Sequence, residues 1–170
     1  MTLMLVKLLF VCTHNSCRSI MCESIFRKIC NETLETASAG AKPSGELNLI
    51  AIETLQKSGY ETTNLRSKSF DDVASFEPDI VVTVCDSAAK EPCPVWLGGV
   101  SVAHWPMKDP SQIKGSPEKI EASFCNLLTK IRTLAKEVNA ASLKAEPKDE
   151  MVSLFQSLQE KIQWEYSNAT

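Results

Sequence analysis

Two residues six positions apart, Cys12 and Arg18, carry the strongest chemical signal in this sequence. They lie in VCTHNSCRSIM, residues 11–21, between an apolar run and a helical pattern. A loop that joins a strand to a helix N-terminus points several backbone N–H groups into one concavity, to which the helix dipole adds partial positive charge. Arg18 supplies a planar fork that suits a tetrahedral oxyanion. Because a cationic setting of this kind favours thiolates, we predict that Cys12 is a nucleophile aimed at a bound phosphate-like ion.

The rest of this loop has residue types that suit an anion cradle. We expect His14 and Asn15 to brace the loop through hydrogen bonds, and Ser16 and Ser19 to donate to the ion or to the thiolate. The predicted oxyanion-binding residues are Thr13, His14, Asn15, Ser16, Cys17, Arg18 and Ser19.

Strands and helices are predicted to alternate along the chain, which indicates a parallel sheet. The predicted strands are 4–11, 34–39, 79–85 and 100–105, and the predicted helices are 18–30, 47–58, 69–75 and 117–138. This pattern predicts a three-layer α/β fold with a four-stranded parallel sheet flanked by helices. Functional sites in such folds lie beyond the carboxyl ends of the strands, so Cys12, Cys85 and the segment after Trp105 are expected to converge.

The C-terminal part of the chain differs in composition from the rest. Residues 1–138 are predicted to form one domain, residues 139–150 (NAASLKAEPKDE) a polar linker, and residues 151–170 a helical extension. Apolar residues recur at helical spacing in the extension, which is typical of a packing or oligomerisation helix.

Composition excludes several classes of protein. The 170 residues carry a net charge of -3 without a basic block, so neither a nucleic acid nor an anionic membrane surface is an expected partner. The apolar N-terminal run contains Lys7 and lacks a small-residue cleavage site before Cys12, which favours a buried strand over a secretion signal. Seven cysteines, an odd number, do not suit a secreted disulfide framework, so a cytoplasmic location is expected.

The string FVCTHNSCRS resembles the signature loop of the low-molecular-weight protein tyrosine phosphatase superfamily. In that superfamily an Asp-Pro pair in a later loop supplies the general acid. The segment HWPMKDPS, residues 104–111, contains such a pair, so the resemblance implies that Asp109 protonates the leaving group.

The superfamily has a phosphatase branch and an arsenate reductase branch, and the cysteines favour the second. The segment TVCDSAAKEPCPVW, residues 83–96, resembles the redox segment of thioredoxin-coupled arsenate reductases, and the resemblance extends from residue 7 to about 138. It implies that Cys12 attacks arsenate, Cys85 is the second thiol and Cys93 carries the disulfide outward. It also implies thioredoxin or another dithiol as the partner, with no metal or organic cofactor.

Other functions stay open at the level of sequence. Cys17 is typical of the phosphatase branch, whereas Ser111 stands where those enzymes usually have a tyrosine, so phosphotyrosine hydrolysis is the first alternative. A non-catalytic redox or arsenite sensor is the second, although Arg18 and Asp109 would then be superfluous. Zinc held by Cys12, Cys17 and a third cysteine at 22 is disfavoured because no Cys-x2-Cys pair occurs. The helical cysteines at 22, 30 and 125 are predicted to be small core residues.

Overall fold

Four parallel strands form the centre of the molecule. A computed structural model describes residues 5–91, 94, 97–144 and 148–168. The strands are β1 (Val6–Cys12), β2 (Leu34–Gly40), β3 (Ile80–Thr83) and β4 (Ser101–His104), in the order β2-β1-β3-β4. β1 lies between two neighbours and its last five residues are buried, which explains why its sequence is almost continuously apolar.

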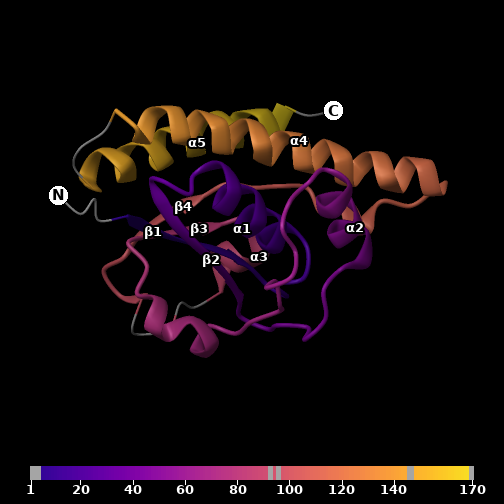
Figure 1. The fold of residues 1–170 in the computed structure, drawn as a ribbon, viewed down its shortest axis with the longest axis horizontal. Coiled ribbons are helices and arrows are strands. Elements are labelled where there is room, and N and C mark those ends of the chain that lie inside the picture. The colour runs from indigo at the N-terminus through magenta and orange to yellow at the C-terminus, as the bar shows by residue number, and fades with distance from the viewer. Residues whose placement is uncertain (1–4, 92–93, 95–96, 145–147, 169–170) are drawn as a thin grey trace.

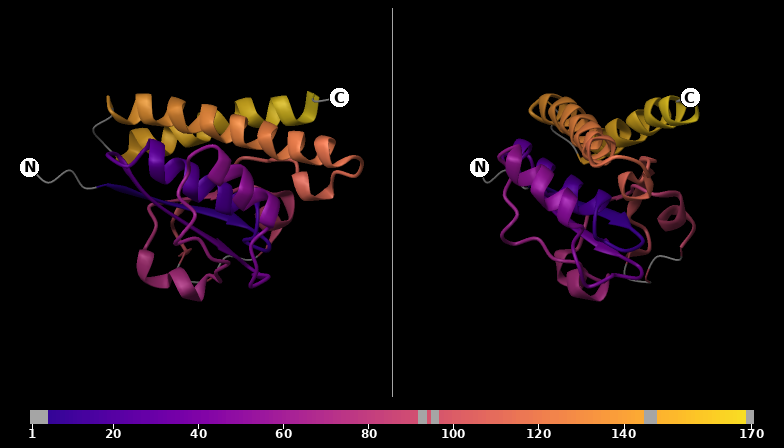
Figure 2. Two further views of the ribbon diagram at one scale, coloured as in Figure 1. Left: turned by 45° about the vertical axis from the view of Figure 1, so that its right-hand side comes forward. Right: turned by 90° about the vertical axis from the view of Figure 1, so that its right-hand side faces the viewer.

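Helices cover the sheet on one face, and a 3-10 segment lies on the other. The helices are α1 (Arg18–Ile29), α2 (Leu49–Lys57), α3 (Asp86–Lys90), α4 (Pro117–Ser142) and α5 (Lys148–Asn168), with 3-10 turns η1 (Asp71–Phe76) and η3 (Pro110–Gln112). Figures 1 and 2 show α1, α4 and α5 on one side of the sheet and η1 on the opposite side. The predicted three-layer α/β fold with a four-stranded parallel sheet is confirmed. None of the helices in the described part of the chain is long and apolar enough to cross a bilayer.

The long helix α4 extends beyond its predicted end. It begins at a cap in which the Ser116 hydroxyl accepts from the Lys119 N–H, with proline in the first turn, and it ends at Ser142. The predicted linker therefore differs from the structure at both ends, because residues 139–142 continue α4 and residues 148–150 begin α5. Two alanines at 140 and 141 favour the helix, and buried Val138 continues its apolar stripe.

Helix α5 contributes to the central core. Phe155 is fully buried and stacks on Trp105, with ring centroids 4.9 Å apart and planes 5° apart. The indole N–H of Trp105 also donates to the Phe155 carbonyl at 3.1 Å. Met151, Leu158 and Ile162 are buried on the same stripe of α5. The helical segment at the C-terminus thus packs against β4 and shares the core of the sheet.

One cysteine prediction is wrong. Cys22 and Cys30 are buried as expected, but Cys125 is exposed. Phe124 and Leu128 on the same helix are buried, and a step of one residue turns the helix by about 100°. Cys125 therefore faces away from the apolar stripe that α4 presents to the core.

Candidate functional site

The carboxyl ends of three strands meet at one edge of the sheet. Val11 pairs with Thr83, which in turn pairs with His104, so the loops after β1, β3 and β4 begin side by side. A cavity of about 400 Å³ opens between these loops. Its lining includes Cys12, Arg18, Cys85, Asp109 and Tyr166. The expected convergence of these segments is thereby observed.

The Cys12 sulfur lies at the floor of this cavity. The residue is 4% exposed, and its Sγ atom lies 2.8 Å from the Ser19 hydroxyl oxygen. The Asn15 amide donates to that same oxygen at 2.8 Å. Because the Ser19 oxygen accepts from Asn15, its own proton is free to point at Cys12, where it would stabilise a thiolate.

The predicted cradle residues divide into two sets. Thr13, His14, Ser16, Cys17 and Arg18 line the cavity. The side chains of Asn15 and Ser19 instead lie behind the loop, both fully buried. The ring of His14 is exposed, and His14 braces the loop through its carbonyl, which accepts from the Ser67 hydroxyl at 3.0 Å.

The backbone of the loop after Cys12 passes so close to the end of β2 that position 40 has no room for a side chain. A Cβ atom added to Gly40 would lie 2.6 Å from the Thr13 carbonyl oxygen and 2.9 Å from the Asn15 nitrogen. Asn15 itself has a left-handed backbone, with φ of 46°, a conformation that asparagine tolerates better than most residues. Glycine at the end of β2 and asparagine in the loop thus permit the backbone turn around the cavity.

Arg18 and Asp109 form an ion pair in the wall of the cavity. An Arg18 Nη2 atom lies 3.2 Å from Asp109 Oδ2, and Nη1 donates to the Met107 carbonyl at 3.2 Å. The other Asp109 oxygen accepts from the backbone N–H and the hydroxyl of Ser111. These contacts hold the Asp109 carboxylate beside the Arg18 guanidinium in the cavity wall.

Cys85, the predicted second thiol, lines the same cavity. It is the N-cap of α3, where its sulfur accepts from the Ala88 N–H at 3.3 Å, and it lies 3.6 Å from the Thr13 hydroxyl. Cys93, the predicted outward thiol, lies outside the described residues. Cys12 and Cys85 thus line one cavity from neighbouring strands.

Cys17, at the N-cap of α1, and Cys22, within α1, are in surroundings that favour neutral thiols. Burial, followed by the negative charge of Asp109, raises the pKa of Cys17 far above its usual range. Burial likewise raises the pKa of Cys22. Cys17 lines the cavity, and its raised pKa keeps it a neutral thiol there. In the described part of the chain, no three His, Cys, Asp or Glu side chains gather in an arrangement that could hold a metal ion.

Sequence reasoning missed residues that only the fold brings to the site. Tyr166, near the end of α5, lines the cavity, and its hydroxyl lies 3.4 Å from Asp86 Oδ2. The other Asp86 oxygen lies 3.0 Å from His104 Nε2. Burial and the nearby carboxylate raise the pKa of Tyr166, so the phenol stays protonated and donates to Asp86. No local pattern signals this contact, because its partners are 80 residues apart.

Comparisons with known proteins place this site in a family. Residues 7–148 match the model of the family described as low molecular weight phosphotyrosine protein phosphatase. An arsenate reductase of Oceanobacillus iheyensis is 36% identical over 122 residues, which cover 72% of this chain and 86% of that protein. An arsenate reductase of Bacillus subtilis is 33% identical over 128 residues, 75% of this chain and 91% of that one.

Solved structures agree on the fold. The thioredoxin-dependent arsenate reductase of Corynebacterium glutamicum superposes with a TM-score of 0.62 at 20% identity, covering 84% of this chain and 63% of that one. A low molecular weight phosphotyrosine phosphatase from Vibrio cholerae gives 0.65 at 19% identity, covering 82% and 97%.

Proposed function

The chain belongs to the low molecular weight phosphotyrosine protein phosphatase family, and on that premise we propose that it reduces arsenate to arsenite. The observation that carries the proposal is that a further thiol from a neighbouring loop, Cys85, lines the same cavity as Cys12 and Arg18. Hydrolysis of a phosphate ester needs only the first of these thiols, whereas the reduction of arsenic needs an electron pair from a second.

The first step uses the groups around Cys12. Arg18 and the loop backbone hold the arsenate, and the Cys12 thiolate attacks arsenic to form an S–As(V) bond. One oxygen leaves as water after Asp109 protonates it. The Ser19 hydroxyl, 2.8 Å from the Cys12 sulfur, stabilises the thiolate before the attack.

The second step transfers the electrons. The Cys85 thiolate attacks the Cys12 sulfur, the S–As bond breaks, and its electron pair stays on arsenic, which leaves as As(III) arsenite. A Cys12–Cys85 disulfide remains. Cys93 then attacks Cys85, which releases the Cys12 thiolate and leaves a Cys85–Cys93 disulfide. Thioredoxin or another dithiol reduces that bond and restores the enzyme.

The test is a single turnover of the fully reduced protein with arsenate and no external reductant. We expect about one arsenite per chain, and disulfide mapping by mass spectrometry that finds Cys85–Cys93. Cys85→Ser should release no arsenite yet still hydrolyse p-nitrophenyl phosphate, because it retains the first-step groups. Cys125→Ser, which changes an exposed cysteine, is the matched control and should behave as the unaltered chain.

Phosphotyrosine hydrolysis is a second candidate, favoured by one observation. Tyr166 brings an aromatic ring to the wall of the cavity, where an aryl phosphate could stack against it. Brisk hydrolysis of aryl phosphates without arsenite release, together with a Cys12–Cys17 disulfide after oxidation, would replace the reductase proposal with this one.

A further inference from the structure

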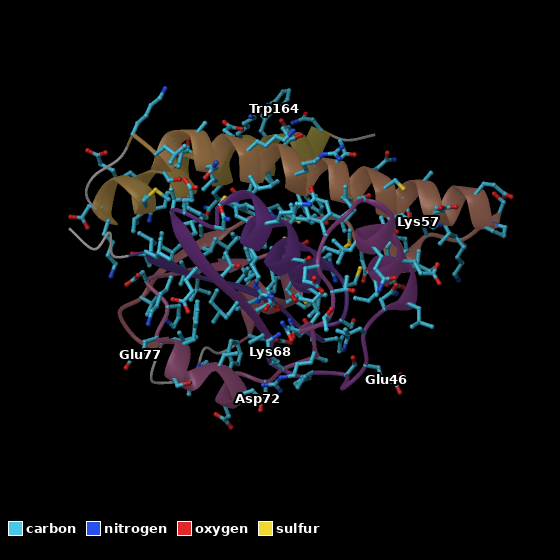
Figure 3. All side chains as sticks on the ribbon, viewed as in Figure 1. Glu46, Lys57, Lys68, Asp72, Glu77 and Trp164 are labelled. Carbon is cyan, nitrogen blue, oxygen red and sulfur yellow. The ribbon has the colours of Figure 1, made fainter. Side chains whose placement is uncertain are left out.

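A buried ion pair lies behind the catalytic loop, on the side away from the cavity. Lys68 Nζ and Glu23 Oε2 are 3.1 Å apart, and the two side chains are only 8% and 4% exposed. Neither residue lines the cavity, and the reaction proposed above uses neither. Figure 3 shows Lys68 in the lower part of the view, away from α4 and α5.

Burying this ion pair costs desolvation free energy, so its presence behind the loop calls for a functional explanation. Taking two charges out of water is expensive, and neutral side chains of similar size often serve stability as well. Burial lowers the pKa of Lys68, and the Glu23 carboxylate opposes that effect. Glu23 is held further by hydrogen bonds from Arg27 and from Ser38. The charges are thus placed in a fully connected polar network.

This network reaches the Cys12 sulfur through four contacts between polar side chains. The Lys68 ammonium lies 3.4 Å from the Ser38 hydroxyl, which accepts from the Asn15 amide at 2.9 Å. The same amide donates to the Ser19 hydroxyl, which touches Cys12 at 2.8 Å. Every link joins buried atoms, so water does not compete for them.

A second contact from Lys68 decides which way the Asn15 amide points. The backbone N–H of Lys68 donates to Asn15 Oδ1 at 2.8 Å, so the amide oxygen faces Lys68 and the amide nitrogen faces Ser19 and Ser38. The ammonium also donates to the Arg66 carbonyl at 2.9 Å, which secures the segment that carries this N–H. Ser19 must then accept from Asn15 and direct its own proton to Cys12.

We propose that Lys68 is a positioning residue for the nucleophile: paired with Glu23, it holds Ser38 and Asn15 so that the Ser19 hydroxyl points at the Cys12 sulfur. This inference rests on the proposed function only in taking Cys12 as the nucleophile. The buried pair thus fixes the geometry of the loop and stabilises the thiolate without contacting the substrate.

The test uses Lys68→Met, Lys68→Arg and the double variant Glu23→Gln/Lys68→Met, with Lys57→Met as the matched control. Lys57, on α2, also pairs with a glutamate, Glu121 of α4, but both side chains are more than half exposed. Figure 3 shows Lys57 away from Lys68. The readouts are the rate of Cys12 alkylation by iodoacetamide at pH 6, kcat and KM for p-nitrophenyl phosphate, and the thermal midpoint.

We expect Lys68→Met to slow Cys12 alkylation and to lower kcat by about 10- to 100-fold, as displaced catalytic groups do. Lys68→Arg should recover most of the loss because it restores the cation. The double variant has no unpaired buried carboxylate, so its thermal midpoint should return toward that of the unaltered chain while its alkylation rate stays low.

A folded double variant with the unaltered alkylation rate and kcat would overturn the proposal, because the pair would then matter for stability alone. The same holds if Lys68→Met matches Lys57→Met in every readout. Absence of arsenite from the unaltered chain would refute the proposed reductase function, whereas alkylation of Cys12 would still decide the role of Lys68.

Discussion

Replacing Phe155 by alanine tests whether helix α5 belongs to the cooperative core. Phe155 is fully buried and stacks on Trp105 at 4.9 Å. Removal of a buried phenylalanine side chain costs about 3–5 kcal/mol, and the lost aromatic pair accounts for about 1 kcal/mol of it. The hydrogen bond from the indole N–H to the backbone carbonyl at 155 does not need the side chain. We therefore expect the free energy of unfolding to fall by about 4 kcal/mol.

The assay is urea unfolding followed by both tryptophan fluorescence and far-ultraviolet circular dichroism. With a slope of about 2.5 kcal/mol per molar urea, Phe155→Ala should lower the midpoint by about 1.6 M, with the two probes still coincident. Trp164→Ala is the control on the same helix, because Trp164 is 69% exposed and lies on the outer side of the helical layer (Figure 3). It should change stability by less than about 0.5 kcal/mol.

Two results would refute this reasoning. A midpoint shift for Phe155→Ala as small as that of Trp164→Ala would mean that α5 contributes little to the core. A separate early transition that accounts for the helical signal of α5 would mean that the helix unfolds on its own, as an appended unit would.

Three further predictions concern the site and the pH dependence of stability. Arg18→Lys should lower kcat/KM for p-nitrophenyl phosphate by about 10- to 100-fold, since lysine cannot form the two-pronged contact with an oxyanion; a loss under threefold in steady-state assays would contradict that role. Asp109→Asn should slow hydrolysis of phenyl phosphate by about 100-fold or more but that of p-nitrophenyl phosphate far less, because nitrophenolate leaves without a proton; equal losses would exclude general-acid catalysis. Partial burial raises the pKa of Asp79, but hydrogen bonds from Lys148 and a β1 backbone N–H outweigh it, so the pKa is lowered overall. A carboxylate with a lowered pKa stabilises the fold above the unfolded-state pKa of about 4, and this stability is lost as the pH falls further. Asp79→Asn should therefore reduce the urea midpoint at pH 7 and flatten the decline of that midpoint below about pH 4. A decline parallel to that of the unaltered chain would contradict this.

Local patterns in the sequence were sufficient to predict the sheet and the reactive loop. The apolar run before Cys12 and the valine-rich run before Cys85 identify two adjacent strands, and the carboxyl ends of parallel strands necessarily share an edge. The six-residue spacing from Cys12 to Arg18 places a thiol and a guanidinium at the two ends of one short loop. Such features depend on neighbours in the sequence, so they are readable without a structure.

What the sequence did not reveal depends on packing between distant segments. The last turn of α4 extends past residue 138 and Cys125 turns outward because of where the helix lies on the core. The apolar stripe of helix α5 is recognisable in the sequence. Only the docking of α5 on β4 brings Tyr166 to the cavity, where it contacts Asp86, a residue 80 positions earlier in the chain.

The buried polar network shows the same limit. Lys68 and Glu23 are 45 residues apart, and by composition alone each is a typical surface residue. Burial and hydrogen-bond geometry join them to the polar network behind the loop, and both are properties of the tertiary structure. The sequence by itself therefore determined the fold and indicated the groups that we propose to react. The tertiary structure decided which groups surround them, because those contacts join segments with no local relation in the chain.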